Sequence, residues 1–103
     1  MHVGRWESVH ADEMTETAIR ALYEPSGAYR TSVYEYDPGA RFSGATRSAT
    51  WYVLDGECHW VGTTSCDLRG GDVACVPEGG YELEVRGERT LRLVIVWELP
   101  DAF

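Results

Sequence analysis

The sequence contains no lysine, no asparagine and no glutamine. Their absence excludes catalysis through a lysine Schiff base, an oxyanion hole built from side-chain amides, and N-linked glycosylation. Lysine and asparagine have A-rich codons, so the lack of both suggests a bacterial genome rich in G and C. All nine basic residues are arginines, against 17 acidic residues, and the formal net charge is −8. Without a basic cluster, this charge argues against binding to nucleic acid or to anionic membranes.

Long apolar segments are missing as well. No run approaches the ~18 apolar residues that a membrane-spanning helix needs, and residues 1–7 contain no apolar core of a signal peptide. We therefore expect a cytoplasmic protein without membrane contact. Cysteine is scarce: Cys58, Cys66 and Cys75 are an odd number without CxxC spacing. This pattern predicts reduced thiols rather than a disulfide framework.

The composition that remains is typical of one small globular domain spanning residues 1–103, with 44% apolar residues to form a core. Helical periodicity is poor, and the β-branched Thr15 and Thr17 interrupt the best candidate segment. We predict an N-terminal arm over residues 1–17 and a first strand near residues 18–23. Glycine, proline and aspartate breaks delimit further predicted strands at residues 29–36, 41–43, 50–54, 57–61, 66–68, 73–76, 81–86 and 90–98. Such a series of short strands predicts an all-β sandwich or barrel.

Four motifs occur in a fixed order along these strands: DPG at residues 37–39, YVLDG at 52–56, LRGGD at 68–72 and VPEG at 76–79. Together they resemble the cupin superfamily, whose small barrels carry a YVLxG turn between two motifs that contain glycine and proline. We interpret Asp55-Gly56 as the tight turn of a hairpin. The resemblance covers residues 29–98 and implies a small single-domain cupin. It implies a double-stranded β-helix, or jelly-roll barrel, of about eight or nine short antiparallel strands with an N-terminal arm.

The metal ligands that cupins usually carry, an HxH pair, a glutamate and a later histidine, do not occur at the matching positions. Counting from the motifs, those positions fall on Ser43, Ala45, Ala49 and Glu82. A single carboxylate does not hold a transition metal. We therefore expect a metal-free cupin without a cofactor, which argues against dioxygenase chemistry. His59 alternates with Cys58 and Trp60 and is predicted at the surface, although an atypical Cys/His metal site remains an alternative.

The residues that the resemblance places inside the barrel suggest an aromatic pocket with arginine at its mouth. Parity along residues 41–53 puts every second side chain on one face, and the resemblance implies that this face lines the cavity. The expected substrate-binding residues are Tyr34, Tyr36, Arg41, Ser43, Arg47, Trp51, Trp60 and Cys75. Arg47 is expected to pair with a carboxylate, enolate or phenolate. Alternatively, the aromatic residues fill a barrel without a cavity, and the arginines lie at the surface.

The strand at residues 81–86 can be read in two registers. Counting from the second motif turns Glu82 inward, whereas the alternation of Tyr81, Leu83 and Val85 turns Tyr81 inward. A slip of one residue would expose the whole apolar set, so we favour Tyr81 inward, with Glu82 at the pocket rim. Glu82 and Tyr81 are the candidate catalytic residues, because a carboxylate beside aromatic walls can act as a general base.

Three functions are consistent with these residues. The first is a non-redox isomerase, cyclase or lyase that acts on a small aromatic or polyketide-like bacterial metabolite. The second is a ligand-binding sensor or structural module without chemistry, and the third is a metal-dependent oxygenase with an atypical Cys/His site. Besides the small molecule, we expect a second copy of the chain as partner. Trp6 on the arm and the apolar strand at residues 91–97 suit a homodimer.

Overall fold

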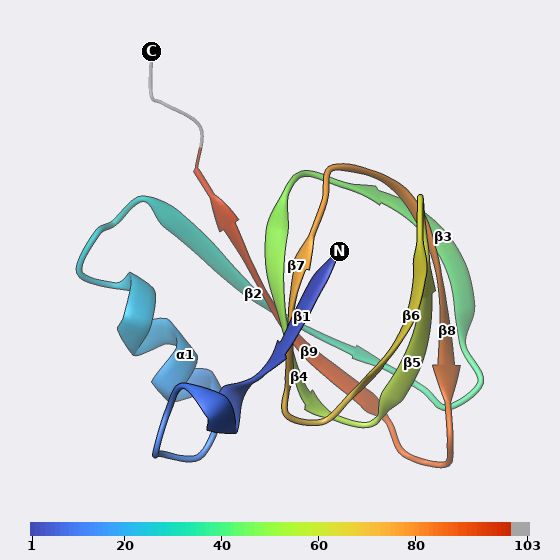
Figure 1. Cartoon of the computed structure of the whole chain (residues 1–103), viewed down its shortest axis with the longest axis horizontal. Coiled ribbons are helices and arrows are strands. Elements are labelled where there is room, and N and C mark those ends of the chain that lie inside the picture. The colour runs from blue at the N-terminus through green and yellow to red at the C-terminus, as the bar shows by residue number, and fades with distance from the viewer. Residues whose placement is uncertain (100–103) are drawn as a thin grey trace.

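The computed structural model describes residues 1–99, and within them the chain forms nine strands in two antiparallel sheets that face each other (Figure 1). The five-stranded sheet contains, in spatial order, β1 (His2–Arg5), β7 (Asp72–Val76), β4 (Ala49–Asp55), β9 (Leu91–Glu98) and β2 (Tyr29–Tyr36). The four-stranded sheet contains β3 (Arg41–Thr46), β8 (Gly79–Arg86), β5 (Glu57–Val61) and β6 (Ser65–Arg69). The predicted all-β jelly-roll class is confirmed.

Each of the eight strands predicted after residue 28 is present, with its ends moved by a few residues at most. The hairpin predicted at Asp55-Gly56 is wrong, because β4 and β5 lie in different sheets and do not pair. Gly56 instead forms the corner at which the chain crosses from one sheet to the other. Its φ is +86°, and a Cβ atom there would lie 2.7 Å from the carbonyl oxygen of Thr90. Only glycine fits this corner without strain.

The N-terminal region differs from the prediction. Residues 16–23 form helix α1 (Glu16–Tyr23) rather than a strand, and the Thr15 hydroxyl caps it by accepting a hydrogen bond from the Ala18 N–H (3.1 Å). The sequence pattern was too short to reveal this amphipathic helix of about two turns, which packs Ile19 against the five-stranded sheet. No helix described within residues 1–99 is both long and apolar enough to span a bilayer.

The arm is also part of the fold. Strand β1 pairs with β7, and Trp6 begins the short 3₁₀ helix η1 (Trp6–Ser8), where it is 4% exposed. Strand β9 lies between β4 and β2 in the middle of its sheet. The two segments on which the homodimer was predicted, Trp6 and the apolar C-terminal strand, are thus buried within a single chain.

Two hydrophobic clusters hold the molecule together. The barrel cluster lies between the two sheets and includes Trp51, Val53, Trp60, Leu83 and Leu93. The helix cluster lies on the opposite, outer face of the five-stranded sheet, beneath α1 and η1, and consists of the buried residues Trp6, Ile19, Tyr52, Val94 and Val96. Strand β4 serves both clusters, because consecutive side chains of a strand point to opposite faces.

Candidate functional site

Strand β8 turns Tyr81 into the barrel and Glu82 out of it. Leu83 and Val85 follow Tyr81 on the inner face and are each 2% exposed, whereas Glu82 lies exposed on the outer face. Tyr81 reaches across to Gly44, its partner in β3, and a Cβ atom on Gly44 would lie 2.8 Å from the Tyr81 Oη. The register that buries the apolar set is therefore the one present. Glu82 is not among the side chains that face the barrel interior.

Arg41 and Ser43 also lie on the outer face, contrary to the prediction that they line the cavity. In β3 it is Phe42 that packs on the barrel cluster, while Arg41 and Ser43 are exposed. The predicted parity breaks at residues 47–48, the connection through which the chain passes from the four-stranded to the five-stranded sheet. Beyond this break, Trp51 faces inward as expected.

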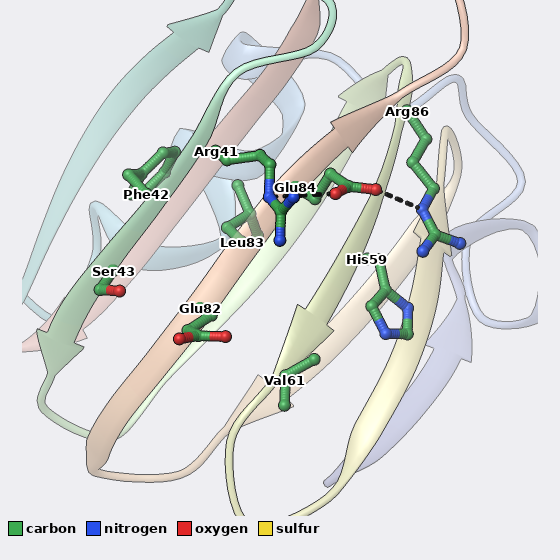
Figure 2. Close-up of a pocket in the computed structure, with 9 residues that line it drawn as sticks. All are labelled: Arg41, Phe42, Ser43, His59, Val61, Glu82, Leu83, Glu84 and Arg86. Carbon is green, nitrogen blue, oxygen red and sulfur yellow. Dashed lines mark hydrogen bonds and ion pairs between the residues drawn. The ribbon is translucent and has the colours of Figure 1, made fainter.

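The outer face of the four-stranded sheet carries a hollow of about 370 Å³, shown in Figure 2. Three of its charged groups are paired with one another, because Glu84 bonds both Arg41 (3.2 Å) and Arg86 (3.0 Å). Glu82, which also lines the hollow, forms no ion pair within residues 1–99. His59, placed at the surface as predicted, lies 2.7 Å from Asp67, measured from Nδ1 to the carboxylate Oδ1. A solvated lattice of mutual ion pairs accounts for this face without any ligand.

Cys75 is the third predicted pocket residue that lies elsewhere. Alternation in β7 turns Ala74 and Val76 inward and leaves Cys75 exposed on the outer face of the five-stranded sheet, opposite His2 of β1. Cys75 and Val73 do share a face, but it is the outer one. Cys58, by contrast, is buried in the barrel, and burial raises the pKa of its thiol to about 12. At neutral pH Cys58 is a protonated, small apolar side chain.

The barrel interior gathers the aromatic residues that the sequence predicted, around Tyr81. The centroid of its ring lies 5.3 Å from that of Trp51, edge-on, and 6.2 Å from that of Trp60, nearly parallel at 15°. Tyr34 and Tyr36 continue this wall along β2, with parallel rings 6.4 Å apart. These contacts combine large apolar area with specific ring geometry.

Two aromatic residues of this wall were missed in the sequence. Phe42 joins Tyr36 (4.7 Å between centroids) to Tyr81 (6.5 Å), and Trp97 packs edge-on against Tyr34 (6.2 Å). The alternation of β9, in which residues 91, 93 and 95 are buried, could have placed Trp97 on the inner face. Phe42 could be placed inside the barrel only once the structure showed that Arg41 and Ser43 lie on the outer face of β3.

The barrel cluster contains several groups that can donate hydrogen bonds. The indole Nε1–H groups of Trp51 and Trp60 are buried, each in a side chain 2% exposed, and neither has a hydrogen-bond partner within the described chain. Burial, followed by the neighbouring tyrosines, raises the pKa of the Tyr36 and Tyr81 hydroxyls. Both hydroxyls therefore keep their protons at neutral pH and can donate.

A cavity of about 440 Å³ adjoins this wall. Its lining consists of Arg30, Tyr34, Arg47, Trp97, Glu98 and Leu99. Arg47 and Tyr34 were both predicted as binding residues, and the structure brings them to the same cavity. Arg30 was missed, because only the pairing of β2 with β9, which sets Arg30 opposite Trp97, shows where it lies.

A divalent metal, which the cupin resemblance implies, does not fit the residues present. Ser43 and Glu82 point away from the interior, and the Tyr81 ring lies directly over Gly44, between the two predicted ligand positions 43 and 45. The inward carboxylate of Asp72 is held by the Arg5 guanidinium at 3.0 Å. Across residues 1–99, no three His, Cys, Asp or Glu side chains come together in a group that could hold a metal ion.

Comparisons with known proteins agree on the fold. No protein-family model and no curated protein sequence matches this chain. Among solved structures, it is similar to the cupin domain of Cnp3 from Schizosaccharomyces pombe, with a TM-score of 0.62, 19% identity, and coverage of 73% of this chain and 58% of that one. It is also similar to a cupin superfamily protein from Desulfitobacterium hafniense, with a TM-score of 0.60, 16% identity, and coverage of 73% and 71%.

A DUF861 family protein from Thermotoga maritima matches over more of both chains. Its TM-score is 0.58 at 16% identity, and the match covers 85% of this chain and 96% of that one. At identities this low, structural similarity establishes only the fold, and the function has to be argued from the residues of the site. The two facing sheets, the order of the strands and these neighbours agree with the motifs in the sequence, and the chain has the fold of a small cupin.

Proposed function

We propose that this protein binds a small planar organic molecule in its barrel and that the ligand carries hydrogen-bond acceptors. The observation that carries the proposal is the pair of buried indole N–H groups of Trp51 and Trp60, which have no hydrogen-bond partner among residues 1–99. Leaving such a donor unsatisfied costs roughly 1–3 kcal/mol, and native proteins seldom retain one without a reason. An acceptor atom of a ligand supplies what the chain does not.

The surroundings define the shape and chemistry of that ligand. Aromatic rings form the walls, which favours a flat, largely apolar molecule. The Tyr36 and Tyr81 hydroxyls retain their protons, so they are two further hydrogen-bond donors besides the two indole N–H groups. A carbonyl, enolate or phenolate oxygen complements such a set of donors. A small aromatic or polyketide-like metabolite has both the flat ring and the oxygen.

A second candidate is catalysis on that molecule, as a non-redox isomerase, cyclase or lyase. The observation in its favour is that the half-buried Tyr81 hydroxyl, with its raised pKa, can hydrogen-bond a carbonyl and stabilise the charge that develops there. A base is also needed, and Glu82 lies outside while Asp72 is bound to Arg5. Binding without turnover is therefore the function that the geometry supports best.

The test uses the indole N–H signals of the full-length ¹⁵N-labelled protein, which has only four tryptophans. Acetophenone is a suitable neutral probe, because it combines a flat ring with one carbonyl acceptor. We expect its titration to move the Trp51 and Trp60 signals downfield as each acquires a hydrogen bond. The Trp6 signal serves as an internal control, because its Nε1 already donates to the Asp12 carbonyl at 2.8 Å.

Two variants separate the roles of the candidate residues. Tyr81→Phe should lower the affinity for acetophenone several-fold, since one neutral hydrogen bond is worth about 1 kcal/mol. Glu82→Gln should leave the affinity unchanged, because this side chain lies outside the barrel. If saturating acetophenone leaves both the Trp51 and Trp60 signals where they are, the barrel is a filled core and the proposal is wrong.

A further inference from the structure

We propose that Arg30 and Arg47 form an anion-binding subsite, so that the ligand is a planar organic acid with one carboxylate. This inference rests on the proposed function, because it extends the same ligand from the barrel interior into the adjoining cavity of about 440 Å³. Tyr34 connects the two spaces: it packs on the barrel cluster and also lines that cavity.

The pairing of the arginines points to this cavity. Six of the nine arginines form ion pairs with carboxylates: Arg5, Arg20, Arg41, Arg86, Arg89 and Arg92. Within residues 1–99 the other three, Arg30, Arg47 and Arg69, form none. Two of these three line the same cavity, in a chain with a net charge of −8. Within residues 1–99, this cavity therefore gathers two of the three arginines that form no ion pair.

The geometry suits an aromatic acid. Tyr34 and Trp97 stand edge-on to each other at 85°, with centroids 6.2 Å apart, and supply two apolar walls. Arg30 lies opposite Trp97 across the β2–β9 pair, and Arg47 comes from the connection between β3 and β4. A guanidinium binds a carboxylate through two parallel hydrogen bonds. Glu98 on the same rim reduces the local charge to about +1, which matches a single carboxylate.

The hollow on the outer face provides a contrast within the same molecule. It also contains two arginines, Arg41 and Arg86, but Glu84 bonds both of them (Figure 2). An anion would have to displace Glu84 there and would meet Glu82 as well. The cavity with the unpaired arginines is therefore the better anion site.

The experiment compares benzoate with acetophenone, two molecules of nearly the same shape that differ by a negative charge at neutral pH. Dissociation constants are measured from the indole N–H signals, where Trp97 reports the subsite and Trp51 and Trp60 report the interior. We expect benzoate to bind at least about tenfold more tightly, since a hydrogen bond to a charged group contributes more than a neutral one. Arg30→Gln and Arg47→Gln should each remove most of this preference, so that benzoate and acetophenone bind with similar affinities.

Arg69→Gln is the matched control, because it removes the same charge from an arginine that also has no ion pair within the described chain but lies on β6, away from the cavity. Equal affinities for the two probes, or an equal loss in Arg69→Gln, would overturn the anion subsite. The proposed function would still stand if the Trp51 and Trp60 signals moved. Benzoate that shifts only Trp97, in an arginine-dependent way, would keep the subsite and overturn binding in the interior; no binding of either probe would overturn both.

Discussion

The two aromatic clusters of this protein use the same residue types but treat their polar atoms differently. In the helix cluster, the Trp6 indole donates to the Asp12 carbonyl, and the hydroxyls of Tyr23 and Tyr52 bond each other. In the barrel cluster, the indoles of Trp51 and Trp60 are just as deeply buried and have no hydrogen-bond partner in the described part of the chain. The clusters lie on opposite faces of one sheet, and β4 contributes to both.

The two faces of the sheet therefore differ in whether their buried indole donors have a partner within residues 1–99. Where packing alone matters, a chain of this size finds partners for its buried donors, as it does beneath α1. The same chain leaves two donors open in the barrel. The unpartnered donors are therefore specific to the barrel and do not reflect a general looseness of packing, which is the reason for proposing a ligand there.

The largest expected effect is on the helix cluster. Trp6→Ala should lower the free energy of unfolding by about 3–5 kcal/mol, because it leaves a cavity under η1 and an unpaired Asp12 carbonyl. Trp60→Phe keeps an aromatic ring and removes an unpartnered donor, so its cost should be under about 1.5 kcal/mol. Urea unfolding monitored by circular dichroism measures both. Equal losses would remove the contrast between the clusters.

An intermediate effect is expected for the hydroxyl pair. Tyr52→Phe should cost about 1 kcal/mol at pH 8, because the Tyr23 hydroxyl loses its partner. Burial and the Tyr23 bond raise the pKa of Tyr52 well above its ordinary value near 10. The unfolded chain therefore loses this proton first as the pH rises past ~10, and the stabilisation declines there.

Urea unfolding of the wild type and Tyr52→Phe at several pH values from 8 to 11 tests this sign. The gap between them should be constant up to about pH 9.5 and should narrow above it. Tyr29→Phe is the control, because Tyr29 is 41% exposed and is not hydrogen-bonded through its hydroxyl within residues 1–99. A gap that widens toward pH 11 would contradict the raised pKa.

The smallest effect on stability is expected in the barrel, from Gly44→Ala. The new methyl group would meet the Tyr81 hydroxyl at 2.8 Å, and the end of this side chain can move aside, so we expect a cost of about 1 kcal/mol or less. Ligand affinity should nevertheless fall several-fold, as for Tyr81→Phe. Gly80→Ala is the matched control, because the nearest atom to its new Cβ would be the Gly44 carbonyl oxygen, at an ordinary contact distance of 3.8 Å. Unchanged acetophenone binding in Gly44→Ala would show that Tyr81 does not position the ligand.

Local signals were sufficient for the strands and for much of the aromatic wall. Alternating side chains and Gly/Pro breaks located β2 to β9, and apolar alternation alone chose Tyr81 over Glu82 as the inward residue. Helix α1 was mistaken for a strand, because it is held by tertiary contacts of Ile19 more than by its own short pattern.

The predicted side-chain direction was correct for residues whose face follows from apolar burial and wrong for small or polar ones. Tyr34, Tyr36, Trp51 and Trp60 gather inside, whereas Arg41, Ser43 and Cys75 lie outside. An aromatic side chain is stable mainly on the buried face of a strand, whereas a serine, arginine or cysteine can occupy either face. Their positions depended on how the chain turned at residues 47–48 and on which face of β7 met the barrel.

By itself, the sequence determined the all-β class, the strands after residue 28 and the absence of the usual metal ligands from their expected positions. These follow from local alternation, turn residues and side-chain chemistry. Only the tertiary structure decided that β4 and β5 belong to different sheets and that Arg30 and Arg47 line one cavity. It alone also decided that the indoles of Trp51 and Trp60 have no hydrogen-bond partner within the described residues 1–99. The reason is that strand pairing, the hydrogen-bond partners of buried donors and the meeting of two side chains at one cavity all depend on residues distant in the chain. Local sequence patterns do not encode such relations.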